Sequence, residues 1–124
     1  MPLVEQTKRM ISAKQLSLMK KTAYLINCAR GGIVVEEDLI AALEQGQIAG
    51  AGLDVLSQEP MPADHPMMKL HQVIISPHMA AQTQETTGKI VRMAAQGTLA
   101  VLNGEKWPHV ANPEVYEHSY WQGK

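Results

Sequence analysis

Three side chains in the middle of the chain combine a cation, an acid and a base, which together could bind a carboxylate and move a proton. They are Arg30 in the segment NCARGG, Glu59 in DVLSQEP and His78 in SPH. Each follows a short apolar segment of the kind that forms a strand. Because ligands bind at the carboxyl ends of parallel strands in open α/β sheets, we expect the three side chains at one rim.

The chemistry of the three groups is complementary. The planar fork of Arg30 matches a carboxylate at two points, which a lysine cannot do. A carboxylate near the imidazole of His78 favours and orients its charged form, so that His78 can act as acid and base near neutral pH. Taken singly, each residue has a plainer interpretation: a surface ion pair for Arg30, a loop carboxylate for Glu59 and a hydrogen-bonding histidine for His78.

The segments that would position these residues alternate between strand-like and helix-like patterns, which is typical of parallel α/β architecture. Strands are predicted at 23–27, 48–55 and 73–76, and helices at about 13–19, from the acidic residues 36–38 to Gly46, and at about 84–102. The stretch 57–66 is rich in proline and polar residues and is predicted to be a loop. We expect the first strand to be buried, with helices covering the sheet faces and at least one sheet edge lacking a partner within this chain.

Composition narrows the function classes. The chain has 124 residues, of which 45% are hydrophobic and 19% charged, with a formal net charge of −1. This is an ordinary globular composition, without the basic field that nucleic acid binding requires or an apolar run long enough for a bilayer. One cysteine excludes an internal disulfide, and the first residues do not form a signal-peptide pattern. We therefore expect a cytoplasmic protein that binds neither nucleic acid nor membrane.

Several ordered motifs surround the three residues: NCARGGIV at 27–34, GAGLDV at 50–55 followed by Glu59-Pro60, DHP at 64–66 and SPH at 76–78. With these motifs the chain resembles the D-isomer-specific 2-hydroxyacid dehydrogenases, nearly continuously from residue 2 to residue 113. The resemblance implies a partial Rossmann-like parallel sheet of about three strands with flanking helices, truncated at the N-terminus. It assigns 1–108 to the C-terminal half of a dinucleotide-binding domain and leaves 109–124 as a tail.

The same resemblance implies roles for single residues. Arg30 would bind the substrate carboxylate, His78 would transfer the proton and Glu59 would pair with His78. The positions matching the family's cofactor contacts are Pro2, Cys28, Ala29, Arg30, Asp54, His78 and Ala81. No metal is expected, because the nearby histidines and aspartate lack a recognised ligand spacing. A nucleophilic pair of Cys28 with His78 is a weaker alternative.

The implied cofactor is NAD or NADP, and the implied substrate a small 2-hydroxy or 2-keto acid. The glycine-rich turn that seats the pyrophosphate on a helix N-terminus does not occur in this sequence. We therefore expect this chain alone not to bind the cofactor normally, and a missing N-terminal half or a second copy to be its partner. Val35 also stands where the family commonly has an aspartate to begin the helix. The rival interpretation is a non-catalytic remnant, or interaction module, that pairs through its exposed sheet edge.

Overall fold

The structure, a computed structural model, describes residues 1–122 and divides into two compact units, Met1–Ala80 and Ala81–Lys124. Each unit is described by itself. The first contains the sheet and the three residues singled out above, and the second contains a long helix and a small aromatic cluster. None of the helices within residues 1–122 has the length and apolarity needed to cross a bilayer.

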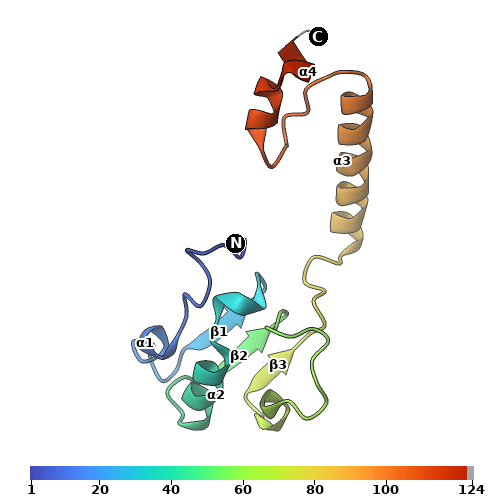
Figure 1. The fold of residues 1–124 in the computed structure, drawn as a ribbon. Coiled ribbons are helices and arrows are strands. Elements are labelled where there is room, and N and C mark those ends of the chain that lie inside the picture. Colours follow the sequence, from blue (N-terminus) through green and yellow to red (C-terminus); the bar gives the residue numbers. More distant parts are fainter. Residues whose placement is uncertain (123–124) are drawn as a thin grey trace. The chain divides into compact units, whose positions relative to one another are not determined.

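The first unit is built on a three-stranded parallel sheet in the order β1-β2-β3 (Figure 1). The strands are short: β1 spans Tyr24–Asn27, β2 Gly50–Leu53 and β3 Val73–Ile75. This confirms the predicted parallel α/β sheet, although each strand is shorter than its apolar segment. All three strands end on the same side, which places the residues that follow them at one rim.

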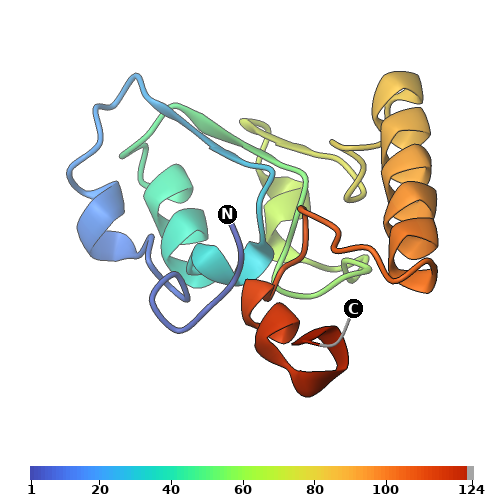
Figure 2. The same cartoon turned by 90° about the horizontal axis from the view of Figure 1, so that it is seen from above.

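Two helices, α1 (Ala13–Leu16) and α2 (Glu36–Glu44), contact each other and cover one face of the sheet (Figure 2). The apolar stripe of α2 points into the core, and Gly46, with φ of +64°, ends the helix as predicted. Helix α1 is shorter than the predicted 13–19; Gln15 accepts hydrogen bonds from the backbone and hydroxyl of Ser12 at its start. The buried core consists of Leu16, Val34, Leu39, Ala42, Leu43, Ile48, Ala51, Leu53, Leu56 and Met67.

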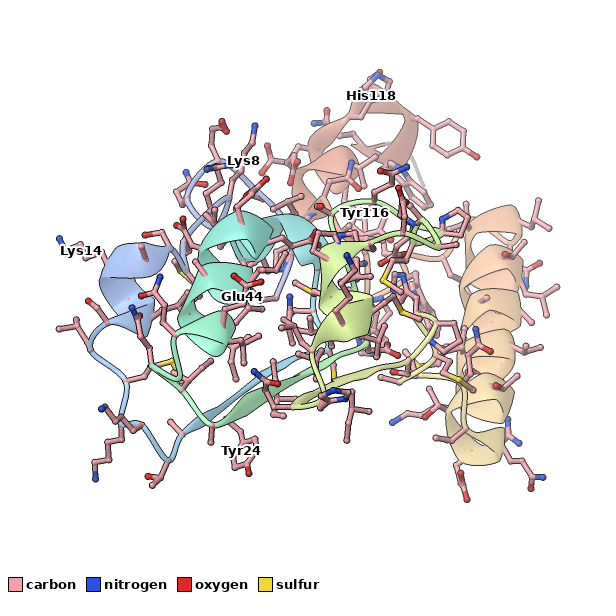
Figure 3. All side chains as sticks on the ribbon, turned by 90° about the horizontal axis from the view of Figure 1, so that it is seen from below. Lys8, Lys14, Tyr24, Glu44, Tyr116 and His118 are labelled. Atoms are coloured by element: carbon pink, nitrogen blue, oxygen red, sulfur yellow. The ribbon has the colours of Figure 1, made fainter. Side chains whose placement is uncertain are left out.

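The opposite face of this sheet is bare within residues 1–80. Ile26, Gly52 and Ile74 are register partners, and the side chains of Ile26 and Ile74 are 68% and 77% exposed. Tyr24 is 67% exposed and points away from α1 and α2 (Figure 3). The expectation of a buried first strand was therefore wrong for this unit, because α1 and α2 pack on the same side of the sheet.

The second unit begins with α3 (Gln84–Leu102), whose bounds match the predicted helix. Thr83 accepts the N–H of Thr86 and thereby caps its N-terminus. After it come a 3-10 helix, Pro113–Glu117, and the short α4 (Ser119–Gln122). The tail predicted to be aperiodic thus contains helical turns. Their aromatic rings meet edge to face, with Tyr116 and Trp121 at a centroid separation of 5.0 Å.

Candidate active site

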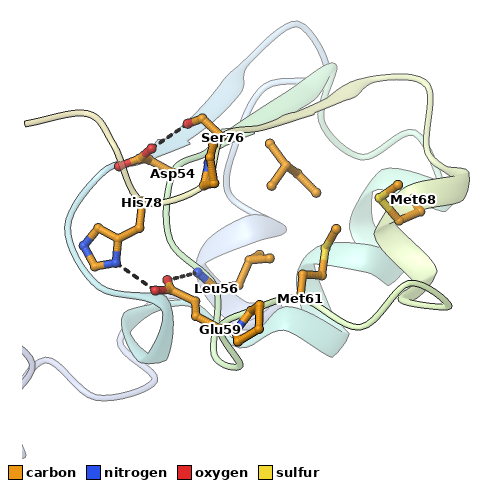
Figure 4. Close-up of a pocket in the computed structure, with 10 residues that line it drawn as sticks. Asp54, Leu56, Glu59, Met61, Met68, Ser76 and His78 are labelled. Atoms are coloured by element: carbon orange, nitrogen blue, oxygen red, sulfur yellow. Dashed lines mark hydrogen bonds and ion pairs between the residues drawn. The ribbon is translucent and has the colours of Figure 1, made fainter. Parts of the chain in front are cut away.

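Arg30, Glu59 and His78 all line one cavity of about 240 Å³ at the carboxyl ends of the strands. Glu59 Oε2 lies 2.7 Å from His78 Nδ1 (Figure 4). Both side chains of this pair are half-exposed, so the cavity gives a ligand access to them. The structure therefore brings the three predicted residues into one place, with the imidazole and the carboxylate in direct contact.

His78 adopts an unusual backbone conformation. Its φ is +50°, in the left-handed region that non-glycine residues seldom occupy. The N–H of His78 donates to the carbonyl oxygens of Asp54 and Ser76, at 2.9 and 3.0 Å. Residues held in such conformations cluster at functional sites, where the surrounding structure over-determines them. The strained turn aims the imidazole at Glu59.

Asp54, the residue that follows β2, binds the turn that carries His78 through its buried carboxylate. Its carboxylate accepts hydrogen bonds from the Ser76 hydroxyl at 2.6 Å and from the N–H groups of Met79 and Ala80 at 2.9 and 2.8 Å. The Ser76 hydroxyl, with the two backbone donors, lowers the pKa of Asp54 below its ordinary value. Asp54 is only 4% exposed and, in this structure, serves the turn that carries His78.

Glu59 is oriented by a backbone group on its own loop. Its Oε1 accepts the N–H of Leu56 at 3.0 Å, while Oε2 faces His78. The Leu56 N–H first, and then His78, lower the pKa of Glu59, so its carboxylate stays ionised near neutral pH. An ionised carboxylate only accepts, so Nδ1 of His78 carries the proton that it donates to Glu59. The other ring nitrogen, Nε2, points away from Glu59 and remains for proton transfer (Figure 4).

Arg30 is placed by the turn at the end of β1. Buried Asn27 accepts the N–H of Ala29 at 3.1 Å and donates to the Arg30 carbonyl oxygen at 3.0 Å. The Arg30 guanidinium donates to the Ala29 carbonyl oxygen at 2.6 Å. Sequence reasoning did not single out Asn27. An Asn directly after an apolar strand is the signal that could have identified it, since Asn favours such side-chain-to-backbone turns.

Gly31 joins the Arg30 turn to the loop of Glu59. A Cβ on Gly31 would lie 2.0 Å from the carbonyl carbon and oxygen of Leu56, so only glycine allows this approach of the two backbones. The separation between the Arg30 turn and the Glu59 loop is thus set by direct backbone packing. This is the physical reason for glycine directly after Arg30.

A second cavity of about 440 Å³ lies on the other side of the Glu59–His78 pair. Its walls are mainly apolar and include Met61, Met68 and Ile75 (Figure 4). It has no arginine or lysine among its lining residues, whereas the first cavity contains Arg30. A carboxylate ligand is therefore accommodated by the first cavity.

The predicted cofactor positions lie in several places. Cys28 and Ala29 line a cavity of about 460 Å³ along β1, together with Met1. Small side chains beside a cavity of this size fit the close approach of a flat nicotinamide ring. Pro2 is exposed, and its carbonyl oxygen accepts the hydroxyl of Thr7 at 2.8 Å. Cys28 and His78 line different cavities, which removes support for a nucleophilic pair. Ala81 is the first residue of the second unit.

Comparison with known proteins agrees with this fold. The model of the family "D-isomer specific 2-hydroxyacid dehydrogenase, NAD binding domain" matches residues 1–80. The chain therefore belongs to the D-isomer-specific 2-hydroxyacid dehydrogenases and contains part of their NAD-binding domain.

Individual relatives extend the match beyond residue 80. The chain is 47% identical over 114 residues to glyoxylate reductase of Thermofilum pendens, which covers 92% of this chain and 34% of that protein. The NAD-complexed 2-hydroxyacid dehydrogenase of Lactobacillus delbrueckii ssp. bulgaricus superimposes with a TM-score of 0.79 at 37% identity, covering 90% of this chain and 38% of that one.

An NADPH complex is also among the similar structures. The D-isomer-specific 2-hydroxyacid dehydrogenase of Xanthobacter autotrophicus Py2, in complex with NADPH and MES, superimposes with a TM-score of 0.78 at 32% identity. That superposition covers 93% of this chain and 47% of the other. The chain spans about a third of the length of the curated relatives it matches.

Proposed function

We propose that this chain carries the proton-transfer and carboxylate-binding half of an NAD(P)-dependent 2-hydroxyacid dehydrogenase site. The single observation that supports the proposal is the cavity shared by Arg30, Glu59 and His78, in which Glu59 and His78 lie 2.7 Å apart. The substrate would be a small 2-hydroxy or 2-keto acid. We assign residues 1–108 to the half-domain and 109–124 to the tail.

In the direction of reduction, Arg30 would bind the carboxylate of the keto acid and polarise its 2-carbonyl with charge placed in advance. The protonated Nε2 of His78 would donate to the carbonyl oxygen as the alcohol forms, and would take the proton back in the reverse direction. Glu59 would hold the imidazole through Nδ1 and stabilise its charged form. The hydride of this reaction is supplied by, or returned to, the nicotinamide cofactor.

The residues of this chain that would hold the nicotinamide end are Pro2, Cys28 and Ala29. Asp54, which directly follows β2, and Ala81, which follows His78 in the sequence, would complete this set. Binding of the pyrophosphate and adenosine would need groups outside the motifs of this sequence.

The reducing environment that suits a single unpaired cysteine supports the cytoplasm as the location.

The test is a chimera in which residues 1–113 replace the matching part of the Thermofilum pendens glyoxylate reductase. NAD(P)H-dependent reduction of glyoxylate is then measured. His78→Ala should lower kcat by roughly 10²–10⁴-fold, the range typical of general acid–base catalysis. Arg30→Gln should mainly raise KM, and the exposed His71→Ala serves as the matched histidine control. A folded chimera whose turnover is unaffected by His78→Ala would refute the proposal.

A second candidate function is non-catalytic pairing of two copies through β1. The bare face formed by Tyr24, Ile26 and Ile74, next to the outer edge of β1, favours it. Exposed sheet edges with apolar neighbours are templates for pairing with another chain. Sedimentation of the 124-residue chain should then show a dimer that Ile26→Lys dissociates, whereas a monomer at all concentrations would eliminate this candidate.

A further inference from the structure

The loop that carries Glu59 is tied to the first residue of α2. Glu36 accepts the N–H of Ser57 with one carboxylate oxygen, and its other oxygen lies 3.4 Å from Nε2 of His65. The side chains of Glu36 and His65 are only 11% and 15% exposed. One carboxylate thus contacts both ends of the segment 57–65, and Glu59 lies between the two points of contact.

The hydrogen bonds of His65 indicate which of its nitrogens carries the proton. Nδ1 accepts the N–H of Met67 at 3.3 Å and so caps the 3-10 helix Pro66–Lys69. A nitrogen that accepts carries no proton, which leaves the proton on Nε2, the atom that faces Glu36. The contact between His65 and Glu36 therefore places an N–H group 3.4 Å from a carboxylate oxygen, an electrostatically favourable approach.

The other side of the loop is packed against the Arg30 turn. Leu56 abuts Gly31 so closely that a Cβ there would be 2.0 Å away, and the N–H of Leu56 orients Glu59. The loop is consequently held between two points: Gly31, beside Arg30, and Glu36, at the start of α2. These contacts hold the loop backbone on both sides of Glu59, whose carboxylate faces His78.

We propose that Glu36 is a positioning residue, which holds the 57–65 loop so that Glu59 meets His78 beside Arg30. Val35, at the preceding position, makes no side-chain cap, and Glu36, at the first helical position, links α2 to the 57–65 loop. An effect of Glu36 on turnover rests on the proposed function. Its structural effect on the position of Glu59 does not depend on that function.

The test uses the intact 124-residue chain and follows the carboxyl titration of Glu59 by NMR. Glu36→Ala should free the loop, weaken the contacts of Glu59 with Leu56 and His78, and thereby raise the pKa of Glu59. Loss of a nearby negative charge by itself would lower that pKa, so the two effects differ in sign. Glu37→Ala removes the same charge from the same turn at an exposed position and should not raise it.

A milder variant covers the case in which Glu36→Ala does not fold. His65→Asn keeps an acceptor that caps the 3-10 helix, because Asn is a favoured cap, but is too short to reach Glu36. It should raise the pKa of Glu59 by a smaller amount. A lower Tm with no upward shift in either variant would mean that Glu36 only stabilises the fold, and would overturn the proposal.

The two proposals fail in different experiments. An inactive chimera combined with an upward shift for Glu36→Ala would reject the dehydrogenase assignment and keep the positioning role. An active chimera whose Glu36→Ala form has parental kcat, together with an unshifted Glu59 in the 124-residue chain, would reject the positioning role alone.

Discussion

The backbone N–H of His78 donates to the carbonyl oxygen of Asp54 at 2.9 Å, and the Asp54 carboxylate binds the two N–H groups that follow. One residue thus satisfies three successive donors of a turn whose φ at His78 is +50°. These bonds act together to keep the strained turn in place. The position of the imidazole depends on them.

Removing the Ser76 hydroxyl, the side-chain donor to the Asp54 carboxylate, should loosen this turn. Ser76→Ala deletes the hydroxyl that lies 2.6 Å from the carboxylate, and should raise the pKa of Asp54 because this hydroxyl is the largest cause of its lowering. We expect faster amide hydrogen exchange at Met79 and Ala80, and restoration by Ser76→Thr, which keeps the hydroxyl. Unchanged exchange at both amides would show that the turn does not need Ser76.

The free energy of unfolding should fall as the pH is lowered, because two carboxylates have lower pKa values in the folded state than in the unfolded state. The folded pKa values of Asp54 and Glu59 lie below their ordinary values of 3.8 and 4.5. Their stabilisation is therefore complete above the ordinary values and is lost as the pH falls through the folded ones. The Tm should begin to drop as the pH approaches these ordinary values from above, and should continue to drop through the folded pKa values below them.

The matched variants for this pH dependence are Asp54→Asn and Asp64→Asn. Asp54→Asn should flatten the dependence of Tm on pH, since it removes one of the two groups responsible. Asp64 is exposed on the neighbouring loop, and its replacement should leave the slope near that of the parent chain. Equal slopes for the Asp54→Asn variant and the parent would contradict the assignment.

Gly31→Ala should be severely destabilising. Its Cβ would fall 2.0 Å from the Leu56 carbonyl group, and backbone cannot yield as a side chain does. We expect a loss of about 3 kcal/mol or more in the free energy of unfolding, measured with urea. Gly88→Ala in α3 meets nothing within 4 Å and should stabilise its helix by about 0.5–1 kcal/mol. Similar effects of the two replacements would argue against close packing at Gly31.

Tyr116→Phe should destabilise the second unit. The Tyr116 hydroxyl accepts the N–H of Trp107 at 2.7 Å and donates to its carbonyl oxygen at 2.8 Å. Deleting it removes two hydrogen bonds and should cost about 1–2 kcal/mol, which tryptophan fluorescence during urea unfolding would measure. Tyr24→Phe, at a side chain that is 67% exposed, is the control and should have little effect.

Local signals in the sequence were sufficient for several elements. The bounds of α3, the acidic first turn and glycine end of α2, and the three parallel strands follow from periodicity, capping and turn residues. These features depend on neighbours within a few residues, which is why a pattern can predict them. The placement of Arg30, Glu59 and His78 at one rim was predictable too, because parallel strands share an end.

Only the tertiary structure decided how those residues are held. The Asp54 carboxylate binds donors 22 to 26 residues away in the chain, and Glu36 reaches Ser57 across 21. The contact of Gly31 with Leu56 and the bare sheet face at Ile26 likewise depend on packing between distant segments. Such contacts leave no periodic trace in the sequence. The residues proposed to carry the chemistry were therefore evident from their types and order, whereas their positioning by Asp54, Gly31 and Glu36 required the folded chain.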